Sequence, residues 1–180
     1  VGKSEIGEAY EFFENAPARA QERRDINAGL IRPNGIPMGM PQFDNLLFHK
    51  GFGRSELSIF MAGAKRGKTL AIWDIGKRFS LQGYNVLGIT LEVSKGVIGA
   101  RLDANVSNIP MSKLNDEADA VEAKVKAAGL RAGRYDIYEY PSNGLSPNGV
   151  KALIEQRKAD GIVYDAIVVD YLDIMCPNKW

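Results

Sequence analysis

Apolar residues in this chain follow two spacings in turn, one typical of strands and one typical of helices. Short runs rich in Val, Ile and Leu predict strands at residues 56–61, 85–91, 135–140 and 166–169. Between these runs, apolar residues three or four positions apart predict helices at residues 68–81, 95–105, 114–128 and 147–160.

Strands separated by helices predict an α/β fold, with right-handed crossovers and a mainly parallel sheet flanked by helices. The run at residues 85–91 is apolar enough to be buried on both faces of the sheet. Ligands of such sheets bind beyond the carboxyl ends of the strands. We therefore expect the functional residues at that edge.

An N-terminal helical arm of residues 1–28 is expected to precede a core of residues 29–180. After Ser4, a candidate helix cap, one helical face carries Ile6, Tyr10 and Phe13. Pro17 interrupts or restarts this helix. A Pro- and Gly-rich connector then leads to a short helix expected at residues 43–48. The arm either packs on its own core or docks on a neighbouring subunit, and the pattern leaves both open.

Composition sets broad limits on the class of protein. Hydrophobic residues make up 45% and charged residues 25% of the 180 residues, as in a globular domain with a sizeable core. The net charge of +1 neither requires nor excludes nucleic acid. With one cysteine, no membrane span and no signal peptide, we expect a cytoplasmic protein without membrane contact. Because the chain lacks an initiator Met and stops soon after an apolar strand, we expect a fragment of a longer protein.

The segment between the first predicted strand and the helix at 68–81 has the pattern of a phosphate-binding loop. It reads Ala62, Gly63, Ala64, Lys65, Arg66, Gly67, Lys68, Thr69 and Leu70. Backbone N–H groups of such a loop surround an anion, and the positive end of the helix dipole adds to the attraction. Lys68 can reach the β- and γ-phosphates of a nucleotide, and the Thr69 hydroxyl can bind Mg²⁺. Ala62 departs from the usual pattern, which opens with Gly, but the Gly-Lys-Thr end is intact.

A carboxylate ends the last predicted strand. Asp170 closes the apolar run at residues 167–169, where it can hold Mg²⁺, directly or through water, opposite Thr69. An acid after a strand is otherwise a turn or cap residue. The phosphate-binding loop favours the metal role, and Asp165 and Asp173 do not lie at the end of the run.

A second carboxylate, Glu92, follows the strand at residues 85–91. At this edge it can orient and deprotonate the water that attacks a γ-phosphate. Spacing alone does not separate this role from that of a helix cap or a solvent-facing side chain.

These motifs together resemble a known family. The phosphate-binding loop, residues 90–93 (Thr-Leu-Glu-Val) and residues 169–172 (Val-Asp-Tyr-Leu) resemble the ATPase domain of DnaB-type, RecA-like replicative helicases, above all the bacteriophage members. Residues 35–39 also resemble the Gly-Ile-Pro-x-Gly opening of this superfamily. The resemblance covers roughly residues 35–175 and implies a RecA-like P-loop NTPase core.

The resemblance also implies roles and partners. Lys68 and Thr69 contact phosphate and Mg²⁺, Glu92 is the catalytic base, and Asp170 is the acid of the second nucleotide motif. Arg101 lies nine residues after Glu92, where family members often carry an Arg near the nucleotide. The implied cofactors are ATP and Mg²⁺. The implied partners are single-stranded DNA, further copies of the chain in a hexamer, and a primase or helicase loader.

The implied function is that of an ATP-hydrolysing motor domain of a ring-forming replicative DNA helicase. In the family, the DNA-binding loops and an arginine finger follow the second acidic strand, beyond Trp180 here. Because such a finger contributes on the order of 10³–10⁵ in turnover, we expect this fragment to bind ATP–Mg²⁺ but to hydrolyse it weakly or not at all. Two alternatives stay open: a recombinase or clock-type ATPase of the same fold, and a nucleotide-binding assembly module without turnover.

Overall fold

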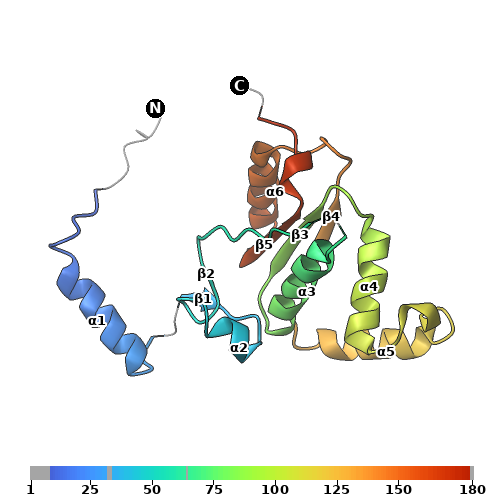
Figure 1. Ribbon diagram of the computed structural model, residues 1–180, viewed down its shortest axis with the longest axis horizontal. Helices are drawn as coiled ribbons and strands as arrows, with labels where there is room; N and C mark the ends of the chain where they lie inside the picture. The colour runs from blue at the N-terminus through green and yellow to red at the C-terminus, as the bar shows by residue number, and fades with distance from the viewer. Residues whose placement is uncertain (1–8, 32–33, 64, 179–180) are drawn as a thin grey trace.

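The computed structural model describes residues 9–31, 34–63 and 65–178. From α3 onward, helical segments separate the three strands β3, β4 and β5 along the chain (Figure 1). They are α1 (Ala16–Asn27), β1 (Gly35–Ile36), α2 (Pro41–Asp44), β2 (Phe52–Gly53), α3 (Lys68–Leu81), β3 (Val86–Thr90), α4 (Lys95–Ser107), η1 (Met111–Lys113), α5 (Ala118–Gly129), β4 (Tyr135–Glu139), α6 (Pro147–Ala159), β5 (Ala166–Asp170) and η2 (Leu172–Ile174).

A parallel sheet forms the centre of the molecule. β3 lies between β4 and β5, and both pairs are parallel, with Thr90 of β3 in register with Asp170 of β5. All five residues of β3 are buried, as expected for a strand covered on both faces. The carboxyl ends of the three strands therefore meet at one edge, which carries the candidate site.

Helices cover both faces of this sheet. On one face, Ile75 and Phe79 of α3 pack with Val86 of β3. On the other face, Leu153 of α6 packs with Leu87 and the following inward positions of β3. Successive residues of β3 thus point alternately toward α3 and α6, which is the geometry of a three-layer α/β domain. The α/β class, the parallel sheet and the helices α3, α4, α5 and α6 confirm the sequence predictions.

The strand predicted at residues 56–61 was wrong. Leu57, Ile59 and Met61 are 79%, 63% and 90% exposed, and no backbone hydrogen bond of the described residues joins this segment to β5. A cavity of about 1080 Å³ separates the segment from β5. An apolar run becomes a strand only when a neighbour pairs with its N–H and C=O groups, and that neighbour is out of reach here.

The arm also differs from the prediction. Residues 9–15 contain no helix, and α1 begins at Ala16, with Pro17 in its first turn. Proline suits this position because its fixed φ matches the helix and its missing N–H is not needed there. α1 has no buried residue and stands apart from the sheet in Figure 1. Ser4 and Ile6 lie outside the described residues, and the division at residue 28 stays a prediction.

The short helix predicted at residues 43–48 lies earlier, at α2. Its position follows from the buried Asp44 carboxylate, which accepts hydrogen bonds from the backbone N–H groups of Met38, Gly39 and Met40 at 2.7, 3.0 and 3.0 Å. These bonds pair backbone donors of the residues just before the helix and so hold the helix against that part of the chain. Within the described residues, no helix is long and apolar enough to cross a lipid bilayer.

A polar network ties α3 to α4. The buried Lys77 ammonium contacts the Asp74 carboxylate on its own helix and the Asn105 side chain on α4. Arg78 donates a second hydrogen bond to Asp74 at 2.6 Å. Burial opposes ionisation of Asp74, but the hydrogen bonds and charges of Lys77 and Arg78 outweigh it and hold the pKa of Asp74 below its usual value.

We expect Asp74→Asn to lower the free energy of unfolding by about 1–3 kcal/mol at neutral pH, because the buried Lys77 loses its charged partner. The folded-state pKa of Asp74 lies below its unfolded value. The difference between parent and variant is therefore complete above about pH 4 and is lost as the pH falls through the folded-state pKa. Urea unfolding at several pH values measures both effects.

Glu122→Gln serves as a control, because Glu122 and Lys126 form an exposed pair on α5. Its removal should change stability little. Equal stability of parent and Asp74→Asn at pH 7 would contradict the assigned role of the network.

Candidate functional site

The Thr69 hydroxyl and the Asp170 carboxylate meet at the carboxyl edge of the sheet. Thr69 lies in the first turn of α3, and its Oγ1 donates to Oδ1 of Asp170 at 3.4 Å. Asp170 is the last residue of β5. Both residues were predicted to hold Mg²⁺, and the structure brings them together across 101 positions of sequence.

Asp170 is fully buried, yet its hydrogen-bond donors are neutral. They are the Thr69 hydroxyl and the Trp73 indole, and the ion pairs of the described residues do not include Asp170. A buried carboxylate without a cationic partner is costly, so this geometry favours a cation. No cluster of three His, Cys, Asp or Glu side chains occurs in the described part of the chain. One hydroxyl and one carboxylate fit Mg²⁺, which is commonly completed by substrate phosphates and water.

The turn before α3 has one backbone feature that a phosphate-binding loop requires. Gly67 adopts a φ of 85°, a left-handed conformation that glycine reaches without strain, and Lys68 begins the helix behind it. Lys68 lies with its ammonium 4.0 Å from the ring centroid of Tyr171. The N-terminus of α3, Lys68 and the Thr69–Asp170 pair therefore lie together, where an anion and its cation can bind side by side.

Glu92 follows β3 in a turn that is bonded to the same edge. The Thr90 hydroxyl donates to the carbonyl of Val93 at 2.6 Å and accepts from its N–H at 3.1 Å. The N–H of Leu91 donates to the backbone carbonyl of Asp170 at 3.0 Å. Glu92 is exposed, and this turn fixes its backbone beside that of Asp170. An exposed carboxylate here can reach solvent water.

The geometry agrees with the comparison with known families. The family model described as the DnaB-like helicase C-terminal domain matches residues 35–179. The chain belongs to this family. A DnaB-like replicative helicase of Enterobacteria phage T4 is 29% identical over 136 residues, which cover 72% of this chain and 29% of that protein.

Solved structures support the same fold for this DnaB-like domain. One, described as an ATPase domain, superposes with a TM-score of 0.74 at 18% identity, covering 94% of this chain and 61% of that one. A DnaB-like replicative helicase, described with its interactions with primase, gives 0.75 at 18% identity and covers 96% and 41%. The chain thus has the RecA-like fold of helicase ATPase domains, and it spans only part of the length of each of these relatives.

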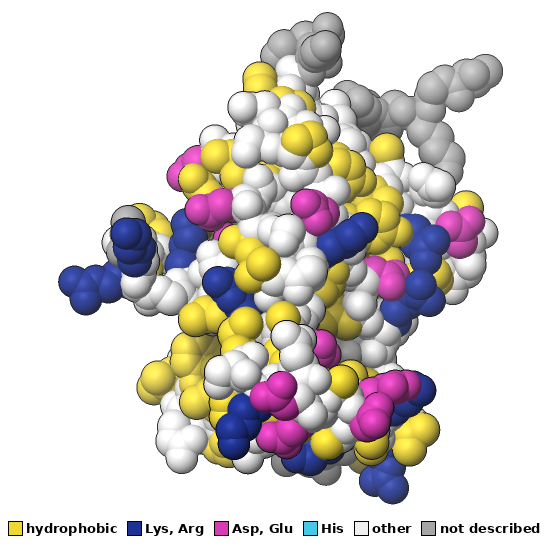
Figure 2. Space-filling view, turned by 90° about the vertical axis from the view of Figure 1, so that its right-hand side faces the viewer, with side chains coloured by type: hydrophobic (Ala, Val, Ile, Leu, Met, Phe, Trp, Pro, Cys, Tyr) yellow, Lys and Arg dark blue, Asp and Glu magenta, His cyan; other side chains and the backbone are white. Residues whose placement is uncertain are grey.

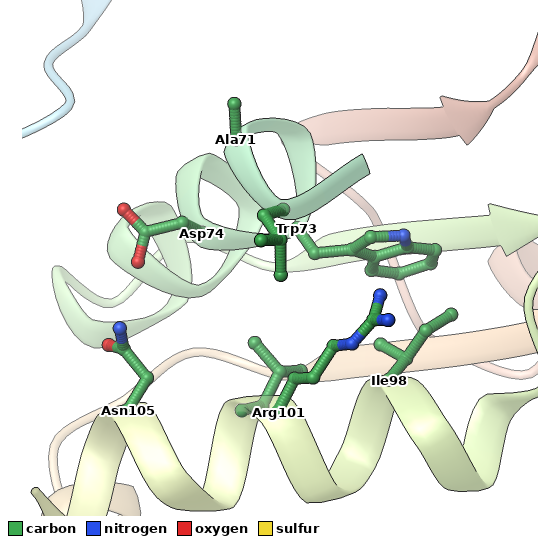
Figure 3. A pocket seen from close by; sticks show the side chains of 8 residues that line it. Ala71, Trp73, Asp74, Ile98, Arg101 and Asn105 are labelled. Carbon is green, nitrogen blue, oxygen red and sulfur yellow. The ribbon is translucent and has the colours of Figure 1, made fainter. Parts of the chain in front are cut away.

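Arg101 of α4 and Leu70 of α3, both predicted to contact the nucleotide, lie together in the DnaB-like domain. Together with Trp73 and Asp74 they line a cavity of about 350 Å³ between α3 and α4. Figure 3 shows the Arg101 side chain extending from α4 toward Trp73. A role of Arg101 or Leu70 in nucleotide binding stays a prediction.

The remaining loop residues are open to solvent. Ala62, Gly63, Lys65 and Arg66 are exposed, as a loop that receives a ligand requires, and their contacts with nucleotide stay predictions. Ala64, predicted to belong to the same loop, lies outside the described residues.

Sequence reasoning missed two residues at this site of the DnaB-like domain. Trp73 was predicted to be a core residue, which its 3% exposure confirms, but its indole N–H also donates to Oδ2 of Asp170 at 3.3 Å. Its position four residues after Thr69 places both on one helix face, a signal that the sequence did contain. Tyr171, which contacts Lys68, has no such signal, because the order of residues does not say which side chain approaches the lysine.

We expect Asp170→Asn to be at least as stable as the parent in metal-free buffer, because an amide removes the buried charge and keeps the shape. Its oxygen can accept from Trp73, and its amino group can donate to the Thr69 hydroxyl. The variant should gain less stability from Mg²⁺–ATP than the parent does, because it loses the cation's share of the binding. Thermal unfolding with and without Mg²⁺–ATP measures both effects.

Asp173→Asn is the matched control, since Asp173 lies three residues further on and not at the end of β5. It should keep the parent's gain in stability. A full Mg²⁺–ATP gain in Asp170→Asn would remove Asp170 from the metal site.

Proposed function

We propose that this chain is the ATP-binding and hydrolysing motor domain of a ring-forming replicative DNA helicase. The observation that carries the proposal is the Thr69–Asp170 pair beside the N-terminus of α3. Membership of the DnaB-like family supports it. The family description and the phage T4 relative both name a helicase, which favours this function over a recombinase, a clock-type ATPase or a module without turnover.

The proposed reaction is in-line attack of water on the γ-phosphate of ATP. Residues 62–69 and the N-terminus of α3 bind the phosphates, and Lys68 neutralises charge on the transferred group. Thr69 and Asp170 hold Mg²⁺, which supplies positive charge to the phosphate oxygens. Glu92 orients the attacking water and accepts its proton. Its exposure and the turn that anchors its backbone to Asp170 support this role.

The partners follow from the helicase function and are proposed with it. The motor moves along single-stranded DNA, and six copies of the protein form the ring. A primase or a helicase loader is a further partner, and the protein acts in the cytoplasm. The structural relative described with primase supports the primase partner. On the face shown in Figure 2, Lys and Arg side chains are interspersed with Asp and Glu, so this face offers no broad basic surface to DNA.

The first test of the proposal is Lys68→Ala. We expect its affinity for ATP–Mg²⁺ to fall at least about ten-fold, because hydrogen bonds to a charged group contribute about 1.5–3 kcal/mol. Titration calorimetry measures the change. Lys65→Ala, an exposed lysine of the same loop, is the control and should bind nearly as the parent does. Unchanged binding by Lys68→Ala would refute the loop assignment.

The second test is Glu92→Gln in the assembled protein. We expect ATP binding to be retained and turnover to fall by about 10²–10⁴-fold, the range that general base catalysis contributes. Steady-state phosphate release measures turnover, and Glu139→Gln at the end of neighbouring β4 is the control. Turnover at the parent rate would exclude Glu92 from the mechanism.

A further inference from the structure

Both oxygens of the Asp170 carboxylate are held by side chains of one helix. The Thr69 hydroxyl donates to Oδ1 at 3.4 Å, and the Trp73 indole N–H donates to Oδ2 at 3.3 Å. The two donors lie one turn apart on α3. A carboxylate rotates easily about its last bond, because that torsion has broad minima. Two donors on opposite oxygens remove this freedom.

The indole is itself fixed from the sheet side. A Cβ on Gly88 would lie 2.4 Å from Cζ3 of Trp73, so only glycine at this position of β3 leaves room for the ring. The Tyr135 ring lies beside it, with centroids 6.2 Å apart, and the Tyr135 hydroxyl donates to the Trp73 carbonyl at 3.3 Å. Trp73 is 3% exposed. The ring therefore has one position, and in that position its N–H points at Asp170.

An apolar side chain would fill this space as well as tryptophan does. The difference is the N–H, because tryptophan is the one large apolar ring that carries a donor without an acceptor. Such a donor cannot compete with Asp170 for a cation. It holds Oδ2 and leaves Oδ1 directed toward the Thr69 hydroxyl.

We propose that Trp73 is a positioning residue for Asp170, and that its indole N–H sets the affinity of the nucleotide site for Mg²⁺. The inference rests on the proposed function, because it concerns the cation that accompanies ATP. Groups that orient a metal-binding side chain commonly change metal affinity by about 10–100-fold when they are removed. Trp73 acts through Asp170 and does not contact the cation.

The central experiment is Trp73→Phe, which keeps an aromatic ring and removes the N–H. At saturating ATP, the Mg²⁺ concentration for half-maximal binding should rise about ten-fold or more. ATP affinity in EDTA should stay at the parent value. A residue that acts only by packing would lower both affinities together or change neither, and either result overturns the proposal.

Tyr135→Phe is the matched control. It keeps the ring that lies beside the indole and removes only a hydroxyl that donates to the backbone carbonyl of Trp73, so the Asp170 carboxylate keeps its two donors. Its Mg²⁺ dependence should equal that of the parent. If Trp73→Phe does not fold, benzothienylalanine at position 73 replaces it, since this residue keeps the size of the indole and lacks the N–H. An unchanged Mg²⁺ dependence in that protein also overturns the proposal.

The contact can be tested without nucleotide. The chain has two tryptophans, so the indole N–H resonance that Trp73→Phe removes from the NMR spectrum belongs to Trp73. Asp170→Asn should shift this resonance upfield in nucleotide-free protein, because an amide oxygen accepts more weakly than a carboxylate. A resonance that does not move would show that the bond is absent and would refute the inference alone.

Measurements of ATP–Mg²⁺ binding show whether the role of Trp73 alone is wrong or whether the proposed function is wrong as well. If the parent binds ATP–Mg²⁺ and Lys68→Ala does not, the site is established, and the Mg²⁺ dependence of Trp73→Phe decides the inference. If the parent binds no ATP–Mg²⁺, the proposed function fails and the inference fails with it, whatever the indole resonance does.

Discussion

The burial of one carboxylate constrains the whole carboxyl edge of the sheet. Asp170 ends β5 with no exposed surface, and an ionised group in that place must be surrounded by donors. Thr69 and Trp73 supply them, and both belong to α3. The start of α3 and the end of β5 are therefore held together by an electrostatic requirement in addition to apolar packing. That is where a phosphate chain and a cation would have to meet.

α3 is also fixed on its other side. The Lys77 ammonium reaches from Asp74 to Asn105 and so joins α3 to α4. α4 begins just after the turn that carries Glu92, and the Ser94 side chain caps it by accepting the N–H of Val97. The groups proposed to bind phosphate, hold the cation and orient water thus lie on elements that share polar contacts. Such a frame limits how far one group can move without the others.

The sequence pattern correctly predicted those features of the fold that depend on residues close together in the chain. The apolar run of β3 predicted a strand buried on both faces, and Ser146 before Pro147 predicted the start of α6. Gly67, Lys68 and Thr69 predicted the turn into α3, and the apolar run before Asp170 predicted its place at the end of β5. In each case, the few residues that make the feature are neighbours in sequence.

The features that the sequence did not predict have one physical cause in common. Each depends on a contact with residues outside its own segment of the chain. Residues 56–61 carry the pattern of a strand, but no strand among the described residues lies beside them to complete their hydrogen bonds. The buried Asp44 sets the place of α2 through bonds to residues before the helix. The sequence around Trp73 predicts only that its side chain is buried in the core. The hydrogen bond of its indole N–H depends on Asp170 of β5, which is distant in sequence.

The close contact between Gly88 and Trp73 has a consequence for how the sequence of this domain can diverge. The indole of Trp73 occupies the volume that any other side chain at Gly88 would need. Substitutions at the two positions should therefore be coupled. A homologue with alanine at the position of Gly88 must carry a smaller side chain at the position of Trp73. A lineage that makes this exchange gives up the indole N–H and must hold its acidic residue by some other donor.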